Sequence, residues 1–267
     1  MHATSRDALA AVREQLTPES AGSLSEVGTE LFSVVALLDS ERGLRRALAD
    51  GSTEPGSRAE LVTRLLRGKV SDATLEVLTV AARQRWSSSA DLLDSLELLG
   101  REALLADAER SGHLDTVEDE LFRLGRIVAG SPSLERALAD RAAAAEQRRE
   151  LIGGLLAGKV CSTTIELVEQ VIGRLREEPA DAFDALSALA ARQREQSVAH
   201  VRSAVMLTDE QEQRLTAALT RTYGRAVTVH VEIDPAVTGG LVVQVGDEVI
   251  DGSVAGRLDA VRTRLAG

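Results

Sequence analysis

Aromatic residues and cysteine are nearly absent from this chain of 267 residues. It has three Phe, one Trp and one Tyr, too few for platforms that stack nucleobases or for an aromatic cage around a cationic ligand. The single cysteine, Cys161, has no partner for an internal disulfide, and no Cys-x-x-Cys pair supplies a zinc site. We therefore expect a protein of a reducing compartment, with no metal and no cofactor.

An excess of basic residues is also missing. Lys and Arg number 31 against 42 Asp and Glu, and the resulting net charge of −11 repels nucleic acid and anionic lipid surfaces. No apolar run approaches the roughly 18 residues of a membrane-spanning helix, and Arg6 and Asp7 interrupt the N-terminus where a signal peptide needs apolar residues. We expect no nucleic-acid partner, a cytoplasmic location, and membrane association only through partner proteins.

Catalytic motifs are scarce as well. The four histidines lack the spacings typical of metal ligands, and no Gly-x-Ser-x-Gly elbow is present. Gly153 to Lys159 resembles a P-loop in its spacing, but Val160 stands where such a loop needs a Ser or Thr to bind magnesium. A helix that ends at Gly158 explains the segment better. A nucleotide-binding enzyme is therefore only the third hypothesis for this chain. The two hypotheses ranked before it are both non-catalytic proteins.

The strongest positive feature is an internal repeat with a constant offset of 90 residues. Glu30-Leu31-Phe32 recurs as Glu120-Leu121-Phe122, and Gly68-Lys69-Val70 recurs as Gly158-Lys159-Val160. Without a gap, residues 30–99 and 120–189 share 24 identities in 70 positions, where this composition gives roughly 6 by chance. We expect a mainly α protein with two tandem bundles of five or six helices each, at residues 1–110 and 111–200.

The apolar spacing in the first copy indicates both a core and a binding surface. Leu61, Val62, Leu65 and Leu66 form one face of a helix, and Ser71 is a suitable N-cap for the next helix. A groove in such a bundle can receive the apolar face of a partner helix. The residues expected to line it are Leu9, Val12, Leu75, Leu78 and Ala82, although the same spacing suits a bundle core.

After about residue 200 the apolar period changes from helical to alternating. Val227 to Ile233 alternates apolar and polar residues, which is typical of a strand with one buried face. We therefore expect a small α+β domain at residues 201–267. Its other expected elements are a strand at Val201–Leu207, a helix opened by the capping box Thr208–Gln211, a hairpin at Leu241–Ile250 and a last helix at Val254–Leu265.

Residues 234–258 resemble the C-terminal signature of the delta subunit of F-type ATP synthase, the family of the oligomycin-sensitivity-conferring protein. The similarity covers 25 consecutive residues, and the helical layout before them also resembles that family. The residues that carry the similarity are Asp234, Pro235, Gly239, Gly240, Gly246, Asp247, Asp251, Gly252, Ser253, Gly256, Arg257 and Leu258.

The resemblance implies a non-catalytic stator subunit that links the catalytic head to the peripheral stalk at the cytoplasmic face of the cell membrane. Its implied partners are the N-terminal helices of the α subunits, which the N-terminal bundle would hold, and the b subunit, which the C-terminal part would hold. The chain departs from the usual pattern in having two bundles, as in the longer actinobacterial-type delta subunits. Ser5 to Ala11 also keeps the alanines of the family's first helix without its aromatic residue. The rival hypothesis is a helical repeat adaptor of another assembly.

Overall fold

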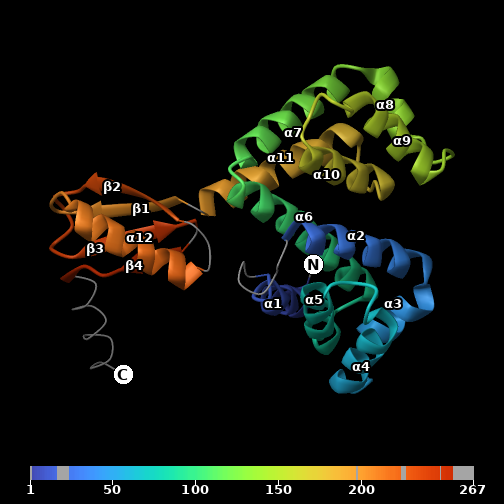
Figure 1. The fold of residues 1–267 in the computed structure, drawn as a ribbon, viewed down its shortest axis with the longest axis horizontal. Helices are drawn as coiled ribbons and strands as arrows, with labels where there is room; N and C mark the ends of the chain where they lie inside the picture. Colours follow the sequence, from blue (N-terminus) through green and yellow to red (C-terminus); the bar gives the residue numbers. More distant parts are fainter. Residues whose placement is uncertain (1, 17–23, 197, 224–226, 247, 255–267) are drawn as a thin grey trace. The chain divides into compact units, whose positions relative to one another are not determined.

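The computed structural model describes residues 2–16, 24–196, 198–223, 227–246 and 248–254 (Figure 1). These residues form twelve α-helices and one four-stranded sheet, and the chain divides into two compact units, residues 1–190 and 191–267. The expected mainly α fold with a small α+β segment near the C-terminus is therefore confirmed. In the described parts of the chain, no helix has both the length and the apolar character needed to cross a bilayer.

Six helices form the first bundle, and local signals explain where several of them begin. Pro55 occupies the first turn of α4, where its missing N–H costs nothing, and the Ser71 hydroxyl accepts the N–H of Thr74 to cap α5. The helices are α1 (Ala3–Arg13), α2 (Leu24–Ser40), α3 (Arg42–Ala49), α4 (Pro55–Leu66), α5 (Asp72–Arg83) and α6 (Ser89–Arg110).

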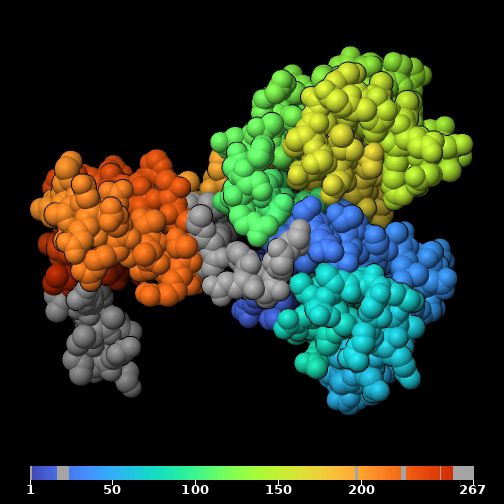
Figure 2. Space-filling view, viewed as in Figure 1, coloured from blue at the N-terminus to red at the C-terminus, as the bar shows by residue number. Residues whose placement is uncertain are grey.

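The second bundle repeats the middle of the first with the offset seen in the sequence. Its helices α8, α9 and α10 begin 90 residues after α3, α4 and α5 and have the same lengths of 8, 12 and 12 residues. In the space-filling view the two groups of helices form two lobes (Figure 2). The helices are α7 (Leu114–Ala129), α8 (Pro132–Ala139), α9 (Ala145–Leu156), α10 (Ser162–Gly173) and α11 (Pro179–Gln196).

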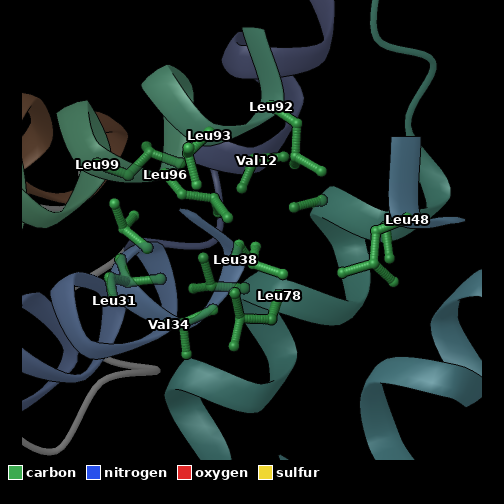
Figure 3. Packing of buried hydrophobic residues seen from close by; sticks show 14 of the residues in the cluster. Val12, Leu31, Val34, Leu38, Leu48, Leu78, Leu92, Leu93, Leu96 and Leu99 are labelled. Atoms are coloured by element: carbon green, nitrogen blue, oxygen red, sulfur yellow. The ribbon is translucent and has the colours of Figure 1, made fainter. Parts of the chain in front are cut away.

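Helix α6 belongs to both hydrophobic cores. Leu93, Leu96 and Leu99 in its first half are buried in the core of the first bundle, where they point toward α1 and α2 (Figure 3). Leu104 and Leu105, five and six residues after Leu99, are buried in the core of the second bundle. A 22-residue helix is about 33 Å long, which allows its two ends to pack in different cores.

Two further contacts join the bundles within residues 1–190. Phe32 of α2 packs against Gly100 of α6 and is buried in the second core rather than the first. Arg174, which follows α10, pairs with Asp94 of α6 at 3.3 Å and also with Glu97, whose side chain is only 7% exposed. The second copy is therefore packed on the first through apolar and charged contacts.

The C-terminal unit is a twisted sheet covered on one face by a helix. The strand order is β2-β1-β3-β4, with β1 parallel to β2 and the other pairs antiparallel. Leu219 of α12 packs on Ala199, Val201, Val243 and Val245, which share one face of the sheet. The elements are β1 (Val198–Ser203), α12 (Asp209–Tyr223), β2 (Thr228–Ile233), β3 (Leu241–Val245) and β4 (Glu248–Asp251).

The first strand differs from the one expected at 201–207. It begins at Val198 and ends at Ser203. The strand ends at Ser203 because its pairing with β2 and with β3 stops at that residue, opposite Ile233 and Leu241. The expected capping box is confirmed: the Thr208 N–H donates to Gln211 Oε1 at 2.9 Å and the Gln211 N–H donates back to Thr208 Oγ1. The expected last helix, apart from residue 254, lies outside the described residues.

Candidate docking groove

An apolar groove opens in the first bundle between helices α2 to α6. About 410 Å³ of space, open solvent included, lies among its lining side chains, most of which are buried. Leu37 of α2 and Leu65 of α4 are 39% and 37% exposed, so these two side chains mark the mouth. A concave apolar surface of this kind suits the apolar face of a helix. The groove is lined by Val34, Leu37, Leu38, Leu44, Leu48, Val62, Leu65, Leu66, Leu78, Ala81, Ala82, Leu92 and Leu96.

The five residues expected to bind a partner lie in one hydrophobic cluster. Leu78 and Ala82 of α5 are buried and line the groove. Leu9 and Val12 of α1 are also buried, while Leu75 is half-buried against the same cluster. In Figure 3, Leu78 lies beside Leu38 and Val34, which line the groove from α2. The sequence-based set therefore includes two residues of the groove and lacks those contributed by α2, α3, α4 and α6.

A buried arginine fixes the helices that form the groove. Arg58 of α4 is 2% exposed and donates through Nη1 to the carbonyl oxygens of Leu48 at 3.2 Å and Gln84 at 2.8 Å. Its Nη2 donates to the Arg83 carbonyl at 3.3 Å. These carbonyls lie at the ends of α3 and α5, where backbone acceptors lack helical partners and a cation is favourable. Arg148 donates to Leu138 at the same place in the second bundle.

A glutamate caps the helix that supplies the floor of the groove. Both carboxylate oxygens of Glu30 accept the N–H of Ser71, at 2.9 and 3.0 Å, and Oε2 also accepts the Ser71 hydroxyl. The negative charge lies at the N-terminus of α5, where the helix dipole favours it. The motif Glu30-Leu31-Phe32 was identified as a repeat, but this role depends on a partner 41 residues away.

The second bundle keeps an apolar residue at every position that lines the groove of the first. At its corresponding surface, Ile127 and Leu155 are 60% and 42% exposed, compared with 39% and 37% for Leu37 and Leu65. The alignment alone could have found this correspondence. The counterparts are Leu124, Ile127, Val128, Leu134, Leu138, Ile152, Leu155, Leu156, Val168, Val171, Ile172, Ala182 and Leu186.

The P-loop-like segment is a helix end. Gly153 lies inside α9, which finishes at Leu156, and Gly158 follows with a left-handed φ of +70°. Lys159 Nζ donates to the Leu155 carbonyl at 2.8 Å. The backbone N–H groups within a helix are engaged with carbonyls and cannot cradle phosphates. The expected helix end is therefore confirmed.

Cys161, His200 and His230, the other candidate chemical groups, have local partners. Among the described residues, no three His, Cys, Asp or Glu side chains gather as a set of metal ligands. Cys161 Sγ lies 3.2 Å from Thr164 Oγ1, and its N–H donates to Glu120, as at the Ser71 cap. His200 and His230 are adjacent on β1 and β2, with ring centroids 6.1 Å apart, a proximity created by the parallel register.

Several residues of the C-terminal signature shape the turns of the sheet. Asp234 Oδ1 accepts the Ala236 N–H at 2.9 Å and so closes the turn after β2. A Cβ atom on Gly240, which has a φ of +82°, would lie 2.4 Å from the Gly252 carbonyl oxygen. Asp251 accepts the Ser253 N–H at 2.9 Å, and hydrogen bonds from Ser253 hold the pKa of Asp251 below its ordinary value.

The remaining signature residues are distributed between described and undescribed segments. Pro235 is exposed in the turn after β2, and Gly239 and Gly246 have φ values of +69° and +55°. These conformations favour glycine because it lacks a Cβ atom. Asp247, Gly256, Arg257 and Leu258 lie outside the described residues.

A family model matches more than half of the chain. Residues 101–265 match the family model described as ATP synthase delta (OSCP) subunit. That match includes the second bundle and the C-terminal unit, so the first bundle lies largely outside it.

Curated relatives match both bundles. "ATP synthase subunit delta" of Nocardia farcinica is 55% identical over 269 residues, covering 100% of both chains. The protein of the same name from Rhodococcus opacus is 56% identical and covers 99% of each. A chain in the structure titled "Cryo-EM structure of Toxoplasma gondii mitochondrial ATP synthase hexamer, composite model" is 17% identical, covering 62% of this chain and 95% of that one; its TM-score of 0.32 is too low to support an inference. From the family match and the full-length relatives, the chain belongs to the ATP synthase delta (OSCP) subunit family.

Proposed function

We propose that the chain is a non-catalytic stator subunit in the peripheral stalk of an F-type ATP synthase. It links the catalytic head to the membrane-anchored stalk and resists the torque of the rotor during proton-driven ATP synthesis. The observation that carries the proposal is the full-length similarity to relatives named ATP synthase subunit delta. A stator works by binding its neighbours, so the role requires neither a cofactor nor a catalytic residue.

The proposed partners are the α subunits of the head and the b subunit of the stalk. We assign an N-terminal helix of an α subunit to the first bundle, residues 1–110, because its groove suits a helix. The b subunit is assigned to the C-terminal domain, residues 201–267, with residues 111–200 as a second helical domain between them. Membrane association then comes through these partners, at the cytoplasmic face of the cell membrane.

The expected binding residues have different parts in this proposal. Leu78 and Ala82 form the floor against which the partner's apolar residues pack, while Leu9, Val12 and Leu75 support that floor from the surrounding cluster. The exposed leucines at the mouth, Leu37 and Leu65, make the first contacts. Buried apolar anchors at the centre of such an interface supply most of the binding energy.

The test is purification of the tagged, full-length chain from detergent-solubilised membranes of its own organism. We expect the α, β and b subunits to co-purify, and a strain without the chain to lose coupling between respiration and ATP synthesis. Recovery of a different assembly, without α or β subunits, would support the helical adaptor and overturn the stator.

A matched pair of variants tests the assignment of the α-subunit helix. Leu37→Asp places a charge at the mouth of the groove, and Ile127→Asp places one at the corresponding position of the second bundle. We expect Leu37→Asp to lower recovery of the α subunit relative to b, and Ile127→Asp to leave it unchanged. The opposite pattern would assign the α-subunit helix to the second bundle.

A further inference from the structure

The groove of the first bundle has a positively charged edge on the side of α3 and α4, whereas the end of α2 contributes Asp39 and is followed by Glu41. Residues 42–69, which include α3 and α4, contain seven Arg or Lys and three Asp or Glu, a net charge of +4 in a chain of −11. The same two helices supply the groove residues Leu44, Leu48, Leu65 and Leu66.

Five of these cations are exposed and available to a partner. Arg42 and Arg46 lie on α3 close to the groove leucines, and Arg64 precedes Leu65 on α4. The other two follow α4 directly. Among the described residues, none of the five forms an ion pair with Asp or Glu, whereas Arg45 pairs with Asp39 and Arg58 is buried. The five are Arg42, Arg46, Arg64, Arg67 and Lys69.

The duplication conserves the apolar positions of the groove more strictly than the cations beside it. The second bundle retains all thirteen apolar positions, but residues 132–159 contain five Arg or Lys and four Asp or Glu, a net charge of only +1. The positions of Arg42, Arg64 and Arg67 are occupied there by an uncharged Pro, Gly and Ala. Only the Arg46 and Lys69 positions keep a cation. The second copy also carries exposed cations at other positions, among them Arg126 beside Ile127 and Arg141 after α8, so the two copies differ in where their cations lie. The five counterparts are Pro132, Arg136, Gly154, Ala157 and Lys159.

We infer that the groove of the first bundle selects an amphipathic helix whose apolar face enters the groove and whose flanks carry carboxylates. The inference rests on the proposed use of the groove as a docking site for a partner helix. Exposed charges around an apolar contact contribute mainly to partner choice and association rate, and salt screens them. The local charge also offsets the repulsion that the chain's net charge imposes on an acidic partner.

The shape of the surface favours a helix over an anionic membrane. A surface that inserts into a bilayer presents protruding apolar side chains between its basic residues. Here most of the apolar side chains lie inside a concave groove, and Leu37 and Leu65 at its mouth are each less than half exposed. A concave surface holds a convex partner such as a helix.

The experiment uses the full-length chain and two synthetic 18-residue helical peptides. Both carry leucines at positions i, i+3, i+4 and i+7, and they differ only in having Glu or Lys on the flanks. Fluorescence anisotropy at low salt is expected to show about tenfold tighter binding of the Glu peptide, with the preference shrinking at ~0.3 M salt. The double variant Arg64→Glu, Arg67→Glu is expected to abolish or reverse the preference.

Matched variants locate the binding site in one copy. Leu65→Asp is expected to weaken the binding of both peptides at least tenfold, whereas Leu155→Asp in the second bundle leaves it unchanged. Arg136→Glu with Lys159→Glu reverses two charges in the second bundle, and we expect the preference for the Glu peptide to remain. Thermal unfolding of each variant shows whether the fold is retained.

Three outcomes would overturn the inference. They are equal affinity for the two peptides, an equal loss in the second-bundle variants, and saturable binding to phosphatidylglycerol vesicles that Arg64→Glu, Arg67→Glu abolishes. Failure of the proposed stator function can be distinguished from failure of this inference. If the chain prefers the Glu peptide but does not co-purify with α and β subunits, the stator role is wrong and the groove assignment stands. If it co-purifies but lacks the preference, only this inference is wrong.

Discussion

Glu30 and Ser71 form the same contact that Glu120 and Cys161 form in the second copy. The first carboxylate accepts the Ser71 N–H at 2.9 and 3.0 Å, and the second accepts the Cys161 N–H at 3.2 and 3.1 Å. The residue at the helix start has changed between the copies, but its backbone N–H and the glutamate have not. The conserved element is therefore a cap provided by a neighbouring helix, on which the position of α5 and α10 depends.

Removing the charge of either glutamate should destabilise its bundle. We expect Glu30→Gln and Glu120→Gln each to lower the free energy of unfolding by about 1–2 kcal/mol, because a charge-assisted hydrogen bond at a helix N-terminus is weakened. Urea denaturation followed by circular dichroism measures the change. The exposed pair Glu60→Gln and Glu150→Gln, also 90 residues apart, is the control. Equal effects in both pairs would show that the caps are unimportant.

Replacing the buried Arg58 should cost more than replacing an exposed arginine of the same helix. Arg58→Met leaves three helix-end carbonyls without their donor, and we expect a loss of about 2–4 kcal/mol in unfolding free energy. Arg64→Met removes the same charge from the surface of α4 and is expected to change stability by less than about 0.5 kcal/mol. Chemical denaturation of the two variants compares them directly. Similar losses would contradict a structural role for Arg58.

Two glycines of α9 and its C-terminal turn should respond in opposite directions to alanine. Gly154 is inside the helix with open space around its missing Cβ, so Gly154→Ala is expected to stabilise by about 0.5–1 kcal/mol. Gly158 has a φ of +70°, so Gly158→Ala is expected to destabilise by about 1–2 kcal/mol. Thermal unfolding detects both changes. Destabilisation by both substitutions would indicate a segment that is not a helix end.

The turn after α3 should contribute a pH-dependent part of the stability. Hydrogen bonds from the Ser52 hydroxyl and N–H and from Thr53 lower the pKa of Asp50 from its ordinary value of 3.8. A lowered carboxyl pKa stabilises the fold above the ordinary value, and this contribution is lost as the pH falls through the lowered one. Asp50→Ala should therefore be less stable than the parent at pH 7, with the difference shrinking as the pH falls below the ordinary value of 3.8. A difference that is constant with pH would contradict this assignment.

Much of the fold follows from the sequence because its apolar periods are unambiguous. The stripe Leu61, Val62, Leu65 and Leu66 lies on α4, and the alternation from 227 to 233 gives β2. Three prolines at 55, 132 and 179 stand in the first turns of α4, α8 and α11, as their missing N–H predicts. The constant offset of 90 residues also predicted equal helices in the two copies, which α4 and α9 show.

The groove was harder to predict, since residues of the core and residues of the groove recur with the same helical spacing along the sequence. Leu37 and Leu65 have the spacing of core residues, yet they are 39% and 37% exposed, and that exposure depends on helix packing in three dimensions. The dual role of α6 was missed because its leucines occur on several sides of the helix, which gives no single apolar stripe. The burial of Arg58 could not be predicted either, because a single sequence does not distinguish a buried arginine of a helix from an exposed one.

The continuous helix α6 constrains how the duplicated chain can be divided. A fragment that stops at residue 110 would leave Leu104 and Leu105 in water, and one that starts at 111 would lack the side chains that close its own interior. Neither copy is thus expected to fold as an independent domain. Deleting either copy at the boundary of the repeat should yield aggregation-prone products. In a subunit that carries mechanical load, an unbroken helix through both copies also provides a stiff strut where a flexible linker would yield.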